Sequence, residues 1–126
     1  MVLLILESSK LITDRLIDLI SEAREGVKFF RADSYKQATE LLDEFNPDVV
    51  VLDLNLPGAT TLELIKKIKE SNDKRTVIVL FSITDEYTLK QCREYGADFL
   101  FDNYYEFEKI PAVISSIRTK QQHPNG

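Results

Sequence analysis

The spacing of five short apolar runs is the feature that most constrains how this chain of 126 residues can fold. Several of these runs are nearly continuous rather than alternating, which is typical of strands buried on both faces of a parallel sheet. The runs cover residues 2–6, 27–30, 49–52, 77–81 and 99–101. A longer segment follows each run, and apolar residues three and four positions apart in these segments predict amphipathic helices.

This alternation of strand and helix, repeated five times, predicts a doubly wound α/β fold. We expect a five-stranded parallel sheet in the flavodoxin-like order 2-1-3-4-5, with helices on both faces. No internal repeat or linker divides the sequence, so residues 1–119 are predicted to form one domain. Residues 120–126 are predicted to be a disordered tail.

Signals for helix ends support these boundaries. Ser34 with Gln37 matches a capping box, and Thr84 precedes acidic residues that favour another helix N-terminus. Gly26 is expected to end the first helix and Gly96 the fourth, because glycine is common just past a helix C-terminus.

Composition excludes several classes of function. Lys and Arg total 16 against 21 Asp and Glu, and the net charge of -5 argues against binding to nucleic acid. A single cysteine, Cys92, allows neither an intrachain disulfide nor a metal site of several thiolates. No apolar stretch is long enough for a signal peptide or a membrane span, so we expect a cytoplasmic protein without membrane contact.

Polar residues follow the apolar runs at the edge where parallel sheets hold their ligands. These residues are Glu7, Ser8, Asp53, Ser82 and Asn103. In the order 2-1-3-4-5 the first and third strands are neighbours, so Glu7 and Asp53 should face one pocket. Two carboxylates and a backbone carbonyl suit Mg²⁺.

An aspartate at this edge can also act as a nucleophile toward phosphorus, and the hydroxyl of Ser82 could donate to a phosphoryl oxygen. The alternative is that Asp53 only forms a turn, because aspartate side chains commonly bond nearby backbone N–H groups. The case for function therefore rests on the whole set of residues rather than on Asp53 alone.

The segment DLNLPG, which begins at Asp53, resembles the phosphorylation loop of response-regulator receiver domains, Asp-x-x-x-Pro-Gly. The resemblance extends from residue 2 to about residue 119. It implies that Asp53 is the phospho-acceptor and that Glu7 and Ser8 stand at the acidic pair that binds Mg²⁺. It also implies that Asn55 lends its backbone carbonyl to the metal, and that Ser82 is the hydroxyl that responds to phosphorylation.

Three positions depart from that family pattern. Glu7 is one methylene longer than the usual aspartate, Ser8 carries no charge, and Asn103 stands where the family has a lysine. That lysine pairs with the phosphoryl oxygens, whereas an amide supplies no positive charge. Losing one preorganised electrostatic donor typically costs about 10²-fold or more in rate.

The resemblance implies a stand-alone receiver domain that accepts a phosphoryl group from a histidine kinase or phosphotransfer protein. It implies no enzymatic activity beyond self-phosphorylation and self-dephosphorylation. Output is expected through a partner protein that docks on the helix after Thr84, the strand 99–101 and the last helix. Phe99 and Phe101 of that strand are expected to be buried against a helix.

Two alternatives stay open. A pseudo-receiver would keep the fold and bind its partner without phosphorylation, as Ser8 and Asn103 favour. A flavin carrier could share the sheet order, but the segment from Glu7 to Lys10 has no glycine, and its carboxylate would repel a phosphate.

Overall fold

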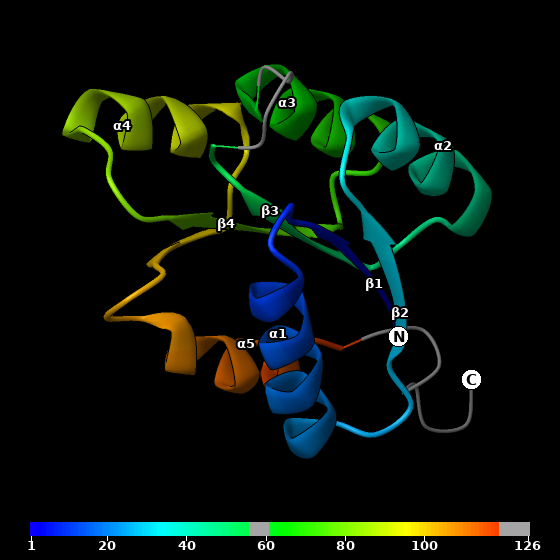
Figure 1. Cartoon of the computed structure of the whole chain (residues 1–126). Helices are drawn as coiled ribbons and strands as arrows, with labels where there is room; N and C mark the ends of the chain where they lie inside the picture. Colours follow the sequence, from blue (N-terminus) through cyan, green and yellow to red (C-terminus); the bar gives the residue numbers. More distant parts are fainter. Residues whose placement is uncertain (56–60, 119–126) are drawn as a thin grey trace.

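A computed structural model of the chain describes residues 1–55 and 61–118, and its strands and helices alternate along the sequence (Figure 1). The strands are β1 (Val2–Leu6), β2 (Lys28–Ala32), β3 (Val49–Asp53), β4 (Thr76–Phe81) and β5 (Phe99–Asp102). The helices are α1 (Lys10–Ala23), α2 (Tyr35–Phe45), α3 (Thr61–Ser71), α4 (Glu86–Tyr95), the 3₁₀ turn η1 (Phe107–Lys109) and α5 (Ile110–Ser116). The predicted loop at Pro57-Gly58, the boundary at residue 119 and the tail lie outside the described residues.

The five strands form one parallel sheet in the order β2-β1-β3-β4-β5, which confirms the predicted topology. Helices α2, α3 and α4 cover one face of the sheet, and α1 and α5 cover the other (Figure 1). Each face has its own apolar core, and the cluster under α1 and α5 includes residues of β1, β3, β4 and β5. Each fully buried Leu or Ile contributes about 1.5–3 kcal/mol to the stability of this arrangement.

The helix caps follow the sequence signals in part. The Ser34 side chain accepts from Gln37 N at 3.2 Å, which confirms this half of the predicted capping box. Gln37 Oε1 accepts from Asp33 N at 3.1 Å rather than from the N–H of Ser34. Gly96 caps α4 as predicted. The N-cap of α4 is Asp85 rather than Thr84, because the Asp85 side chain accepts from the backbone N–H of Thr88.

The end predicted for the first helix was wrong by a few residues. Helix α1 ends at Ala23, before Gly26, because Arg24 leaves the helical conformation. The Arg24 guanidinium donates to the carbonyl of Ile114 at 2.8 Å and to that of Ile117, which ties the end of α1 to α5. This tertiary contact is not visible in the local sequence around Gly26.

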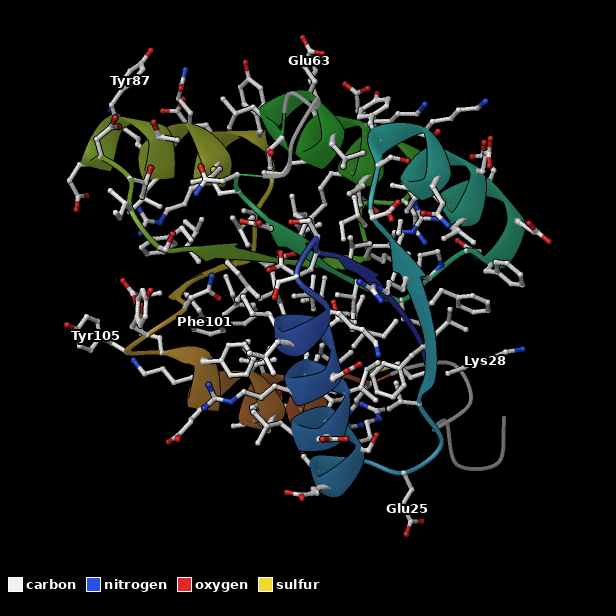
Figure 2. All side chains as sticks on the ribbon, viewed as in Figure 1. Glu25, Lys28, Glu63, Tyr87, Phe101 and Tyr105 are labelled. Carbon is white, nitrogen blue, oxygen red and sulfur yellow. The ribbon has the colours of Figure 1, made fainter. Side chains whose placement is uncertain are left out.

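The expectation that both phenylalanines of β5 are buried holds for only one of them. Phe101 is 8% exposed and packs in the cluster with Ile110 and Ile114 of α5, whereas Phe99 is 37% exposed (Figure 2). The two rings stack with centroids 5.7 Å apart. Since β5 is an edge strand, α5 covers its second half and leaves Phe99 at the surface.

No helix in the described parts of the chain is long and apolar enough to span a membrane.

Candidate functional site

The register of the sheet brings the predicted site residues to one edge and one face. Side chains along a strand alternate between faces, so residues two positions apart share a face. In β1, β3, β4 and β5, the most C-terminal residues that belong to the apolar cluster under α1 and α5 are Ile5, Val51, Leu80 and Phe101. Two positions later in the chain stand Glu7, Asp53, Ser82 and Asn103. The core packing of each strand therefore sets the placement of its polar residue.

Glu7 is the most buried of these polar residues. It is only 4% exposed, and its carboxyl group forms a hydrogen bond with the carboxyl group of Asp53. Burial, and then the hydrogen bond and the negative charge of Asp53, raise the pKa of Glu7 to about 8. Glu7 is therefore protonated at neutral pH.

Asp53 is half-buried at the end of β3, and the turn that follows it fixes its orientation. Its Oδ1 accepts from the backbone N–H of Asn55 at 3.0 Å. Leu54 donates its N–H to Leu80 O at 2.9 Å and accepts from Thr61 Oγ1 at 2.8 Å, which ties this turn to β4 and α3. Asp53 thus makes the turn-forming bond considered as the alternative, and it does so while paired with Glu7.

The remaining predicted residues surround this pair with different degrees of exposure. Ser8, Asn55 and Ser82 are exposed. Asn103 is half-buried, and its N–H donates to Phe81 O at 2.8 Å. Among the described residues, Asn103 Oδ1 and Glu7 Oε2 are buried atoms without a hydrogen-bond partner.

The donor atoms at this edge fit one hard cation held by few protein ligands. Within residues 1–55 and 61–118 no cluster of three His, Cys, Asp or Glu side chains could hold a metal. The pair of Glu7 and Asp53 offers oxygen donors only, and Mg²⁺ commonly uses one or two carboxylates with water or phosphate oxygens completing its shell. A cation in place of the proton on Glu7 would also satisfy the buried Oε2 of Glu7.

Two features near the site were missed by the sequence analysis. Arg31 on β2 lies close enough for its positive charge to oppose part of the rise in the pKa of Glu7. The predicted run 27–30 ended one residue before it. Asp102 Oδ1 accepts from the N–H groups of Tyr104 at 2.7 Å and Tyr105 at 3.1 Å, which shapes the loop after Asn103. Both tyrosines are exposed, and Tyr105 points away from the ribbon (Figure 2).

Two surface hollows lie elsewhere. One, of about 420 Å³, lies between α3 and α4 and is lined by Lys69 and Tyr95 among others. The other, of about 620 Å³, lies beside Arg75, at the end of the sheet where the parallel strands begin. Neither Glu7 nor Asp53 lines either of these two hollows.

Comparisons with known proteins agree with this geometry. The family model of the response regulator receiver domain matches residues 3–115. The chain is 31% identical over 91 residues to the transcriptional regulatory protein MalR of Bacillus subtilis (strain 168), a match that covers 72% of this chain and 39% of that protein. It therefore spans less than half the length of that relative.

A second relative is similar in size. The sporulation initiation phosphotransferase F of Bacillus subtilis (strain 168) is 26% identical over 91 residues, which cover 72% of this chain and 73% of that protein. Among solved structures, the signal receiver domain of a DNA-binding response regulator from Colwellia psychrerythraea 34H superposes with a TM-score of 0.83. That match has 24% sequence identity and covers 90% of this chain and 94% of the other, which supports the fold.

Proposed function

The chain belongs to the family of response-regulator receiver domains of two-component systems, and we propose that its Asp53 accepts a phosphoryl group from a histidine kinase or phosphotransfer protein. Receiver domains are generally signalling modules rather than enzymes, and they interact with such kinases or phosphotransfer proteins. The pairing of Asp53 with the buried Glu7 is the observation that carries the proposal.

The proposed reaction transfers the phosphoryl group between two side chains. A carboxylate oxygen of Asp53 attacks the phosphorus of a phosphohistidine, the O–P bond forms as the N–P bond breaks, and the imidazole leaves with the N–P electron pair. The bond from Asn55 N–H holds the attacking carboxylate in a fixed orientation at the end of β3. Preorganisation of this kind lowers the entropic cost of reaching an in-line geometry.

Receiver domains generally bind Mg²⁺ at this pocket, and here Glu7, Asp53 and the backbone carbonyl of Asn55 would hold it. The ion would neutralise charge on the transferred oxygens. Ser8 contributes no charge at the second acidic position. Glu7 must then release its proton, because a protonated carboxyl group is a weaker metal ligand.

We propose that Ser82 donates its hydroxyl to a phosphoryl oxygen and thereby changes the loop between β4 and α4. Its exposed position directly after β4 supports this role. The signal would pass to a partner protein at the surface of α4, β5 and α5. Phe99, which is partly exposed on β5, adds apolar area to that surface.

A second candidate function is a pseudo-receiver that binds its partner without phosphorylation. Asn103 favours this candidate, because the family's lysine is absent and the amide oxygen is buried without a partner in the described structure. A bound flavin, the remaining alternative, would give the purified protein a yellow colour.

The deciding experiment is intact-protein mass spectrometry after incubation with Mg²⁺ and acetyl phosphate. Asp53→Asn, which preserves the shape of the side chain, is the control. We expect one phosphoryl adduct on the wild-type chain and none on the variant. If neither acetyl phosphate nor a phosphorylated kinase domain gives an adduct, the pseudo-receiver becomes the better account.

A further inference from the structure

Arg31 lies on the same face of the sheet as the two carboxyl groups. The β1–β2 register pairs Ile5 with Arg31 and Leu6 with Ala32, and Glu7 N donates to Ala32 O at 3.3 Å. Paired residues of parallel strands project to the same face. Because Ile5 packs under α1 and α5, Arg31 shares that face with Glu7, which stands two positions after Ile5 and directly follows β1.

Strand geometry puts this arginine within reach of Glu7. Neighbouring strands about 4.8 Å apart and a rise of about 3.3 Å per residue separate the two Cα atoms by about 8 Å. An extended arginine side chain spans most of that distance.

The other cation of β2 is directed elsewhere. Lys28 pairs with Val2, and its Nζ lies 5.6 Å from the centre of the Phe30 ring. Phe30 packs against the core under α2, α3 and α4, so Lys28 is on the opposite face from Glu7. Lys28 and Arg31, both on β2, therefore lie on opposite faces of the sheet.

The site has a charge deficit that Arg31 is placed to reduce. Asn103 contributes no positive charge, whereas a phosphoryl group adds about two negative charges beside two carboxyl groups. A guanidinium is always charged and presents donors that match carboxylate and phosphate oxygens.

We propose that Arg31 is the charge-balancing residue of this site, which favours the negatively charged phosphoryl group on Asp53 and opposes the bound cation. The inference rests on the proposed function, since it assigns a role in the same reaction. Arg31 lies on the β2 side of Glu7 and Asp53, whereas Asn103 lies on the β5 side.

The proposal predicts opposite effects on two ligands. In Arg31→Gln, we expect Mg²⁺ to bind about two- to fivefold more tightly and fluoroberyllate, an anionic phosphoryl mimic, to bind more weakly by a similar factor. Arg31→Lys should restore wild-type values for both. Lys28→Gln removes the same charge from the same strand on the other face, so it should change neither.

Mg²⁺ affinity is measured by titration of amide NMR shifts, and fluoroberyllate affinity by ¹⁹F NMR at saturating Mg²⁺. Unchanged affinities in Arg31→Gln, or changes in the same direction for both ligands, would overturn the proposal. The loss of a positive charge should affect a cation and an anion in opposite directions, whereas a structural defect should weaken the binding of both. If the wild-type chain binds Mg²⁺ but takes neither fluoroberyllate nor a phosphoryl group, the proposed function fails. The Mg²⁺ affinities then still decide the role of Arg31. A wild-type chain that binds neither ligand overturns both proposals.

Discussion

The carboxyl group of Glu7 is hydrogen-bonded to that of Asp53, and the two residues end neighbouring strands that are paired residue by residue up to Leu6 and Leu52. One acid is almost completely buried and the other half-buried. Burial and the neighbouring carboxyl group of Asp53 keep a proton on Glu7 in the absence of a cation. The site is therefore set by competition among a proton, a metal ion and a phosphoryl group.

This competition predicts that the protein loses stability as pH rises. Glu7 has a pKa of about 8 in the folded chain and an ordinary value of 4.5 when unfolded, so the folded state holds an extra proton between these values. The free energy of unfolding should fall from about pH 4.5 to about pH 8 by an amount on the order of a few kcal/mol. Urea unfolding at several pH values without Mg²⁺ measures it.

The matched variant for this pH test is Glu7→Gln, which keeps the size of the side chain and cannot ionise. We expect its stability to vary less with pH and to exceed that of the wild-type chain near pH 8. Parallel pH curves for the two proteins would show that Glu7 does not hold the proton.

Mg²⁺ should displace the proton of Glu7. Because metal ligands must be deprotonated, binding at pH 7 should release a fraction of a proton up to one proton per ion. Calorimetric titration in two buffers of different ionisation enthalpy measures this release. Asp53→Asn should abolish both the heat and the proton release, and Mg²⁺ binding without proton release would contradict the arrangement.

Restoring the family's lysine should speed phosphorylation. Asn103→Lys places an ammonium near the phosphoryl oxygens, and we expect the rate of adduct formation with acetyl phosphate to rise by about 10- to 100-fold. Asn103→Gln, a longer amide without charge, is the control. In the Asn103→Lys background, Arg31→Gln should weaken fluoroberyllate binding less, because the introduced lysine and Arg31 would both stabilise the negative charge of the same group. An equal rate in Asn103→Lys and Asn103→Gln would argue against an electrostatic deficit.

A side chain at position 96 should lower the stability of the protein. The φ of Gly96, 123°, is unfavourable for other residues, and a Cβ atom would lie 2.6 Å from Lys69 Cγ. Lys69 is fixed there by its ion pair with Asp98 at 2.7 Å. We expect Gly96→Ala to cost about 1–3 kcal/mol in the free energy of unfolding.

Gly26→Ala is the comparison for Gly96→Ala. Gly26 also has a positive φ, of 74°, but nothing lies within 4 Å of an added Cβ atom. Its cost should be about 1 kcal/mol, from the backbone conformation alone. Equal losses in urea unfolding would mean that the contact with Lys69 adds nothing.

The sheet order was predictable because its signals are local. Continuous apolar runs and helical periodicity describe each element by itself, and few topologies satisfy such an alternation. The same logic placed Glu7 and Asp53 at adjacent strand ends. The exposure of Phe99 was not predictable in this way, because it depends on how far α5 extends over an edge strand.

The sequence by itself determined the elements, their order and the identity of the polar residues that end the strands, because these follow from side-chain chemistry and short-range periodicity. Only the tertiary structure decided that Glu7 is buried and that Arg31 lies on the same face of the sheet, since both depend on the register between strands distant in sequence. A carboxyl group has no fixed pKa until its surroundings are packed. The charge balance of this site is therefore a property of the folded sheet.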